Sequence, residues 1–285
     1  MGDPPLMTRT LVLSAALVLA LCACSSHPGQ TSQAATPAAL SGRISSGATT
    51  QPGASGQHTT ESGSASGATA SDTARGPLAL PTSSRWKPGV NYDVIAPAQP
   101  TSAPPDKVQV MEVFWLACPH CYALEPYMRA WRKSKPDYVQ FVRVPVMWGP
   151  VQQAHARLFY TLKALGREDL VESAFKTIHD LETRTGTESI MIGASQAGTM
   201  RLQEAFAVRN GVSAAAFGNA YNSFDVHAEL AKAEEITQLY EIQSVPTVIV
   251  DGRFRTDPAK AGGEKQTIAL IDFLAKWVHD HRSAP

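Results

Sequence analysis

Hydrophobic and polar positions divide the chain into two unlike parts. A short apolar run at residues 11–21 is followed by a long stretch, 25–84, that contains no Phe, Trp, Tyr, Val or Cys. Every aromatic residue lies from Trp86 onward. Because the burial of apolar side chains offsets the entropy lost on folding, the stretch 25–84 is predicted to be a disordered tether. The folded domain is predicted to span residues 85–285.

The apolar run at 11–21 indicates a targeting segment. It is too short to cross a membrane, which takes about 20 residues, and it fits the apolar region of a signal peptide, typically about 7–15 residues. Residues 1–24 are therefore expected to form a leader. Leu-Cys-Ala-Cys at 21–24 resembles a bacterial lipobox, which implies a lipid anchor at Cys24 and, with Ser25 behind it, a place at the outer membrane. Ordinary signal-peptidase cleavage, giving a soluble protein, is the alternative.

The folded part begins with the pattern strand, helix, strand. A nearly continuous apolar run at 108–116 predicts a strand that is covered on both faces. A helical stretch follows at about 122–135, with Pro126 expected to kink it, and a β-rich segment comes next at 138–144. This order forms a βαβ unit, whose connection is nearly always right-handed.

A long helical region separates this unit from the last strands. Helical periodicity recurs at 154–165, at 170–181, at 202–209 and along the face from Val226 to Tyr240. A strand at 247–250, a tight Asp251-Gly252 turn and a final helix at about 264–279 complete the chain. These patterns predict an α/β fold with a helical insertion at about 150–240.

Charge and cysteine content exclude two classes of protein. The chain has 25 Lys+Arg and 25 Asp+Glu, so its formal net charge is zero. Because nucleic-acid binding needs a surplus of positive charge on one face, no nucleic-acid partner is expected. With four cysteines in 285 residues, the protein is also not a small domain held together by disulfides.

The candidate chemistry lies where the first strand passes into the helix. The motif Cys118-Pro119-His120-Cys121 holds the only cysteines of the folded part. A zinc site would need further Cys or His ligands at similar spacing, and the sequence has no second such cluster. A purely structural disulfide would close a loop so short that it constrains the unfolded chain little. The strand-to-helix position favours a redox pair over these two alternatives.

The residues of this motif suit a stabilised thiolate. Cys118 is expected at the N-terminus of the helix, where unpaired N–H groups and the helix dipole favour negative charge. Pro119 fixes φ at the helix start, and a protonated His120 stabilises a neighbouring thiolate electrostatically. A stabilised Cys118 thiolate favours the reduced dithiol, so the corresponding disulfide becomes an oxidant.

The segment 114–125, Phe-Trp-Leu-Ala-Cys-Pro-His-Cys-Tyr-Ala-Leu-Glu, resembles the DsbA family of periplasmic thiol–disulfide oxidases in the thioredoxin superfamily. Residues 223–226 and Val245-Pro246-Thr247 extend the resemblance, which covers residue 87 to the C-terminus. It implies a thioredoxin-like fold with an inserted helical domain and no cofactor other than a redox-active Cys118–Cys121 disulfide. Cys118 would exchange with the substrate and Cys121 would resolve. Pro246, after Val245, would be cis beside the disulfide, whereas a trans proline opening an edge strand is the default without the resemblance.

Two glutamates near the motif allow more than one interpretation. Glu112 lies inside the apolar strand, where burial of an ionised carboxylate is costly. The resemblance implies a buried acid that relays protons for Cys121, and a strand-end carboxylate that reaches solvent is the alternative. The family often supplies a lysine on the neighbouring strand, but here only Arg143 is available. Glu125 resembles a family position, and solvated helix surface is the alternative.

These features predict an enzyme of the periplasm that introduces disulfides into exported proteins. A substrate thiolate attacks Cys118, and a second substrate thiol resolves the mixed disulfide, which leaves Cys118 and Cys121 reduced. The expected partners are reduced, unfolded exported proteins and, from the resemblance, a DsbB-like quinone-linked membrane protein that reoxidises the pair. A disulfide reductase or isomerase and a non-catalytic, tethered client-binding module are the alternatives.

Overall fold

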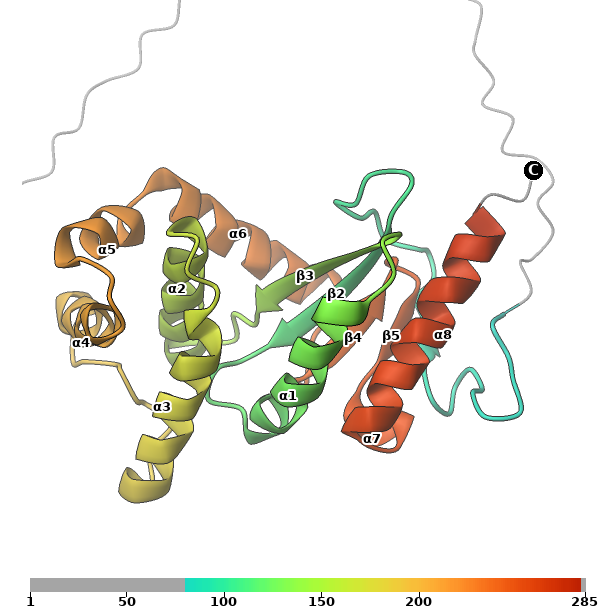
Figure 1. Ribbon diagram of the computed structural model, residues 1–285, viewed down its shortest axis with the longest axis horizontal. Helices are drawn as coiled ribbons and strands as arrows, with labels where there is room; N and C mark the ends of the chain where they lie inside the picture. Colours follow the sequence, from blue (N-terminus) through green and yellow to red (C-terminus); the bar gives the residue numbers. More distant parts are fainter. Residues whose placement is uncertain (1–79, 283–285) are drawn as a thin grey trace, which may run out of the picture. The chain divides into compact units, whose positions relative to one another are not determined.

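The computed structural model describes residues 80–282 (Figure 1). The predicted leader at 1–24, the anchor at Cys24 and the tether up to residue 79 lie outside the described residues and stay predictions. The last residues assigned to the tether, 80–84, are described, and the carbonyl of the buried Pro81 accepts a hydrogen bond from the Tyr92 hydroxyl. Along the described residues, no helix combines the length and the apolar character needed to cross a membrane.

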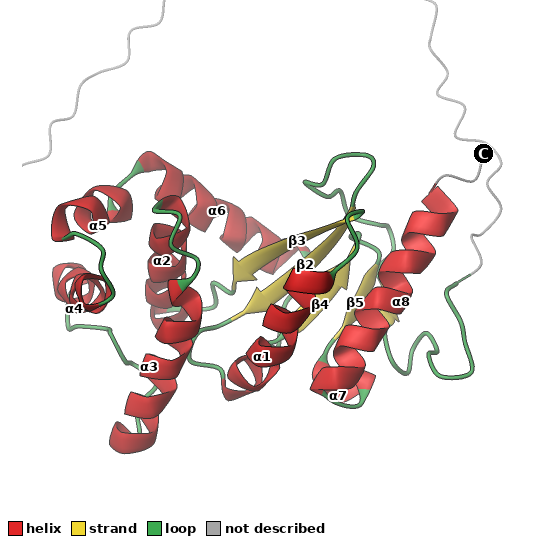
Figure 2. Ribbon diagram, viewed as in Figure 1, coloured by secondary structure: helices red, strands yellow, loops and turns green. Residues whose placement is uncertain are grey.

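A five-stranded mixed sheet lies at the centre of the domain (Figure 2), in the order β1-β5-β4-β2-β3. In chain order the strands are β1 (Asp93–Val94), β2 (Val108–Phe114), β3 (Val139–Pro145), β4 (Thr247–Val250) and β5 (Phe254–Thr256). β2 and β3 are parallel, and the other pairings are antiparallel. Every residue of β2 is buried, because this strand has a neighbour on each side and helices over both faces. The continuous apolar run predicted this burial.

Two long helices, which lie side by side, cover one face of the sheet (Figure 1). These are α1 (Pro119–Ser134) and α8 (Glu264–Arg282), and the short α7 (Pro258–Ala261) precedes α8. Leu124 and Met128 of α1 and Leu274 of α8 pack with Val110 of β2 in one apolar cluster. The burial of these side chains holds α1, and therefore the cysteine motif at its start, against the sheet.

The inserted helices lie between β3 and β4 in the sequence. They are α2 (Pro150–Ala164), α3 (Leu170–Thr185), α4 (Gln196–Arg209), α5 (Ala214–Tyr221) and α6 (Phe224–Leu239). Their apolar side chains form a second cluster with Met111, Val113 and Ile249 on the other face of the sheet. The predicted α/β class with a helical insertion is confirmed.

Capping residues explain where the observed helices differ from the predicted ones. The helix predicted from about 122 begins at Pro119, because Pro119 occupies its first turn and Cys118 is its N-cap. The helix predicted from 202 begins at Gln196, where Ser195 Oγ accepts a hydrogen bond from the Gly198 N–H at 3.1 Å. The short elements β1, α5 and α7 were not predicted, because a segment of so few residues does not show a recognisable hydrophobic periodicity.

The predicted Asp251-Gly252 turn joins β4 and β5. Both residues have positive φ angles, 56° and 63°. A Cβ atom on residue 252 would lie 2.1 Å from the carbonyl oxygen of Gln99, so the position requires glycine for space as well as for conformation.

Candidate redox site

Cys118 and Cys121 lie at the start of α1, just beyond the end of β2. Cys118 is the N-cap with extended φ and ψ, and its N–H donates to the Trp115 carbonyl at 3.1 Å. The two thiols are free, so the structure describes the dithiol form. Cys118 keeps 6% of its surface exposed and Cys121 none. An incoming sulfur therefore has access to Cys118 rather than to Cys121.

The two thiols have opposite acidities. A hydrogen bond from the Cys121 side chain lowers the pKa of Cys118 from 9.0 to about 6, against the effect of burial. The backbone N–H groups of Cys121 and His120 and the charge of His120 contribute to this lowering. Burial raises the pKa of Cys121 well above its ordinary value, and the neighbouring Cys118 raises it further. Cys118 is the thiolate at neutral pH, and Cys121 holds its proton.

The two residues between the cysteines are exposed, as their position on the first turn requires. Pro119 stands at the first helical position, where a missing N–H costs no helix hydrogen bond. His120 is exposed as well, so its positive form is solvated while it acts on Cys118. Within residues 80–282, no three His, Cys, Asp or Glu side chains come together to hold a metal ion.

The segment Val245-Pro246 lies against the cysteines although it is far away in the sequence. The peptide bond between Val245 and Pro246 is cis, so the alternative of a trans proline is wrong. The Cys118 sulfur lies 3.3 Å from the Val245 carbonyl oxygen, to which Cys118 donates a hydrogen bond in its protonated form. This contact places the residue before the cis proline beside the Cys118 sulfur, as the resemblance implied.

Glu112 is buried with only 1% of its surface exposed, so the solvent-reaching alternative is wrong. The parallel register places it opposite Arg143 of β3, whose Nε donates to Glu112 Oε2 at 2.7 Å. Arg143 also donates to Glu125, and Arg132 Nη2 donates to Glu125 at 3.1 Å. Glu125 is 3% exposed, so it does not lie on solvated helix surface.

This charge cluster consists of the buried Glu112, Glu125 and Arg143 and the half-buried Arg132. Burial lowers the pKa of Arg143, but the two carboxylates outweigh it and the net effect is a raised pKa. Burial also raises the pKa of Glu125, against the opposing effect of Arg143. The charge of Glu112 acts on the redox pair by raising the pKa of Cys121. Sequence reasoning left Arg143 and Glu125 open, because their partners come from three different elements.

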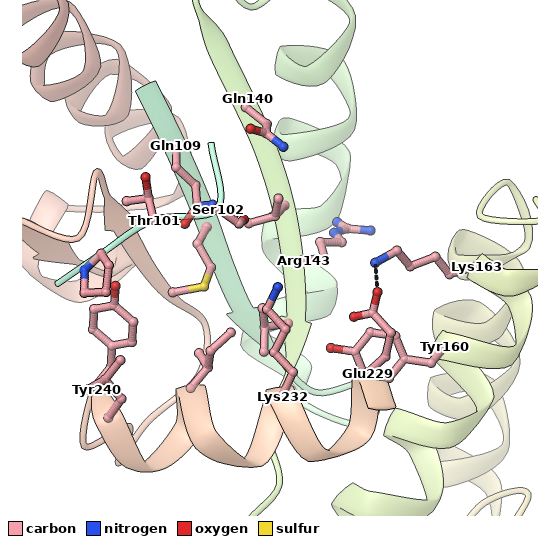
Figure 3. A pocket seen from close by; sticks show the side chains of 16 residues that line it. Thr101, Ser102, Gln109, Gln140, Arg143, Tyr160, Lys163, Glu229, Lys232 and Tyr240 are labelled. Carbon is pink, nitrogen blue, oxygen red and sulfur yellow. Dashed lines mark hydrogen bonds and ion pairs between the residues drawn. The ribbon is translucent and has the colours of Figure 1, made fainter. Parts of the chain in front are cut away.

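A cavity of about 530 Å³ lies between β3 and α6 (Figure 3). Met111 of β2 and Val142 of β3 line it from the sheet, and α6 from Glu229 to Leu239, with its C-cap Tyr240, lines the opposite wall. Glu229 forms an ion pair with Lys163 of α2 at 3.0 Å. Neither cysteine lines this cavity.

Comparison with known proteins was made at the level of sequence and of structure. A family model described as thioredoxin matches residues 103–269. The thiol:disulfide interchange protein DsbA of Burkholderia cepacia is 36% identical over 195 residues, which are 68% of this chain and 86% of that protein. The DsbA protein of Pseudomonas aeruginosa is 34% identical over 187 residues, 65% of this chain and 82% of that protein. The crystal structure of P. aeruginosa DsbA aligns with a TM-score of 0.62 and 30% identity over 70% of this chain and 97% of that chain. The predicted thioredoxin-like fold is therefore confirmed.

Proposed function

Because the chain belongs to the DsbA family of the thioredoxin superfamily and is a thiol:disulfide oxidoreductase, we propose that it works as an oxidase. Its substrates are pairs of thiols in reduced, unfolded proteins exported to the periplasm, and its oxidant is a disulfide between Cys118 and Cys121. The observation that carries this direction is the contrast between the lowered pKa of Cys118 and the raised pKa of Cys121.

The exchange proceeds in two steps. A substrate thiolate attacks the sulfur of Cys118, the Cys118–Cys121 bond breaks, and Cys121 leaves and takes up a proton, as its raised pKa favours. A second substrate thiolate then attacks the substrate sulfur of the mixed disulfide, and Cys118 leaves as a thiolate. Two electrons pass from the substrate to the cysteine pair, and the substrate thiols release their protons to water. Cys118 keeps 6% of its surface exposed and Cys121 none, which supports Cys118 as the sulfur that is attacked.

The lowered pKa of Cys118 sets the size of the oxidising effect. At pH 7 a thiol of pKa about 6 is ionised about ten to one, whereas a thiol of pKa 9.0 is almost entirely protonated. The reduced form is therefore stabilised about tenfold, or ~1.4 kcal/mol. For a two-electron couple this raises the reduction potential by ~30 mV. The effect favours transfer of the disulfide to substrates.

Surrounding residues support the two cysteines in this proposal. Pro119 and His120 shape the helix start, and Val245 and Pro246 border the exchanging sulfur. Glu112 raises the pKa of Cys121 through its charge, so Cys121 takes up a proton more readily when it leaves.

The proposal extends to the cellular location of the protein and to the protein that reoxidises its cysteine pair. The leader at 1–24 would direct the chain to the periplasm, and acylation of Cys24 would anchor it at the outer membrane through the tether 25–84. A DsbB-like, quinone-linked membrane protein would reoxidise the reduced pair. Mass spectrometry of the mature N-terminus tests the anchor.

Mixing the oxidised protein with a reduced, unfolded ribonuclease tests the direction of exchange. We expect one disulfide to form in the substrate per protein molecule and both Cys118 and Cys121 to become reduced. Cys118→Ala abolishes the transfer, because Cys121 alone cannot form the disulfide that oxidises the substrate. Repair of a scrambled substrate without net oxidation would support an isomerase instead. A binding module would be supported if the parent protein transfers no disulfide to the substrate and Cys118→Ala binds the unfolded substrate as well as the parent does.

A further inference from the structure

Two buried histidines from the inserted helices contact the residues that flank the redox motif. His155 of α2 meets Trp115, three residues before Cys118, and His179 of α3 meets Tyr122, the residue after Cys121. His155 is 1% exposed and His179 is 9% exposed. The sequence gives no sign of these contacts, because isolated histidines on helices are usually surface or core residues.

The hydrogen bonds of His155 define its tautomer. The Trp115 indole N–H donates to His155 Nδ1 at 2.9 Å, and an indole nitrogen is only a donor, so Nδ1 carries no proton. Nε2 lies 2.8 Å from the Ile190 carbonyl oxygen, which is only an acceptor, so Nε2 carries the hydrogen. His155 is therefore neutral in this arrangement. Burial lowers its pKa from 6.5 to about 4, which agrees with the neutral form.

The Trp115 contact continues to both cysteines through the backbone. The Trp115 carbonyl accepts the Cys118 N–H at 3.1 Å, which fixes the N-cap of α1. The backbone of Trp115 also acts on Cys121, where it opposes the rise in the pKa of that thiol. Trp115 therefore contacts His155 through its indole ring and Cys118 through its carbonyl.

His179 holds the other side of the motif by stacking. Its ring lies parallel to that of Tyr122, with 4.5 Å between centroids and 11° between planes. His179 Nδ1 lies 3.1 Å from Glu182 Oε2, which orients the imidazole. Tyr122 in turn donates its backbone N–H to the Cys118 carbonyl at 3.0 Å. Tyr122 therefore contacts His179 through its ring and the first turn of α1 through its backbone.

We propose that His155 and His179 are positioning residues that hold Trp115 and Tyr122 and thereby align the hydrogen-bond donors around Cys118. Hydrogen bonds weaken steeply with poor distance and angle, so a loosened motif stabilises the thiolate less. The inserted helices therefore set the reactivity of a sulfur that belongs to the βαβ unit. The proposal builds on thiol–disulfide interchange at Cys118 and is independent of the direction of exchange.

The test compares matched variants of each histidine. His155→Leu removes both hydrogen bonds, whereas His155→Gln keeps an acceptor and a donor. His179→Ala removes the stacked ring, whereas His179→Phe keeps it. His227→Gln is the control, because His227 is an exposed histidine of α6 in the same inserted region.

All variants are made in the full chain with Cys22 and Cys24 replaced by serine. The readout is the rate at which iodoacetamide alkylates reduced Cys118 between pH 4 and pH 8, with circular dichroism to establish folding. In His155→Leu and His179→Ala we expect the alkylation rate of Cys118 at pH 5 to be lower by a factor of about three or more. This factor corresponds to a rise of about half a unit in the pKa of Cys118. The Gln and Phe variants and the His227 control should follow the parent protein.

The proposal is overturned if folded His155→Leu and His179→Ala show the same pH profile of alkylation as the parent protein. It is also overturned if the alkylation rate of His155→Gln decreases as much as that of His155→Leu. If His155→Leu does not fold, Trp115→Phe removes the same hydrogen bond and carries the same expectation. Tyr122→Leu replaces His179→Ala in the same way. Because alkylation needs no protein substrate, a failed oxidase assay leaves this result unaffected.

Discussion

Removal of the Cys121 thiol should make Cys118 a weaker acid. The hydrogen bond from the Cys121 side chain is the largest cause of the lowered pKa of Cys118. A hydrogen bond to a charged acceptor contributes about 1.5–3 kcal/mol, and a thiol is a weak donor, so the lower end applies. This corresponds to about one pKa unit. Cys121→Ala should therefore raise the pKa of Cys118 from about 6 to ~7.

Cys121→Ser is the matched control, because its hydroxyl keeps a donor at the same position. The assay is the absorbance of the thiolate near 240 nm as a function of pH, with Cys22 and Cys24 replaced by serine so that only Cys118 titrates. The serine variant should keep a midpoint near pH 6. A midpoint in Cys121→Ala that stays near pH 6, or an equal rise in both variants, would refute the assignment of the Cys121 side chain as the main source of acidity.

Three further predictions concern the redox potential and stability. The slope of the reduction potential against pH should change from ~59 to ~30 mV per pH unit near pH 6, because above the pKa of Cys118 the dithiol carries one proton fewer. A redox titration in which the slope stays constant through pH 6 contradicts this. Arg143→Met should cost about 3–5 kcal/mol of unfolding free energy in urea at pH 7, since it leaves the buried Glu112 unpaired and leaves Glu125 with Arg132 alone. Arg129→Met at an exposed ion pair should cost only about 0–1 kcal/mol, and similar losses in the two variants would contradict the buried cluster. The pKa of His155 is about 4 in the folded chain and 6.5 in the unfolded chain, so the unfolded chain binds the proton first as the pH falls. The free energy of unfolding should therefore decrease by up to ~3 kcal/mol between about pH 6.5 and pH 4. His155→Gln should lose this acid dependence, and parallel stability curves would contradict it.

The sequence predicted the parts of the site that depend on neighbours along the chain. Cys118 lies at the helix N-terminus because a strand, a short motif with Pro119 and an apolar helix follow one another directly. The Asp251-Gly252 turn was equally local, since both residues accept positive φ. Such features need no knowledge of which distant elements meet.

The features that the sequence left open depend on partners from distant segments. Burial of Glu112 and Glu125 is possible because Arg143 reaches both, and whether β3 and α1 place it there cannot be read from any single segment. His155 and Trp115 are 40 positions apart, so no periodicity reports their contact. The cis form of Pro246 came from the family resemblance alone.

The location of β4 at the far end of the chain determines when the site is complete. A ribosome makes β2, the cysteine motif and β3 first, and Thr247–Val250, which pairs with the open side of β2, more than a hundred residues later. Val245, whose carbonyl meets Cys118, arrives only with that strand. A partly synthesised chain therefore carries both thiols without their full surroundings, and the mature reactivity of the pair is acquired only once the C-terminal segment has joined the sheet.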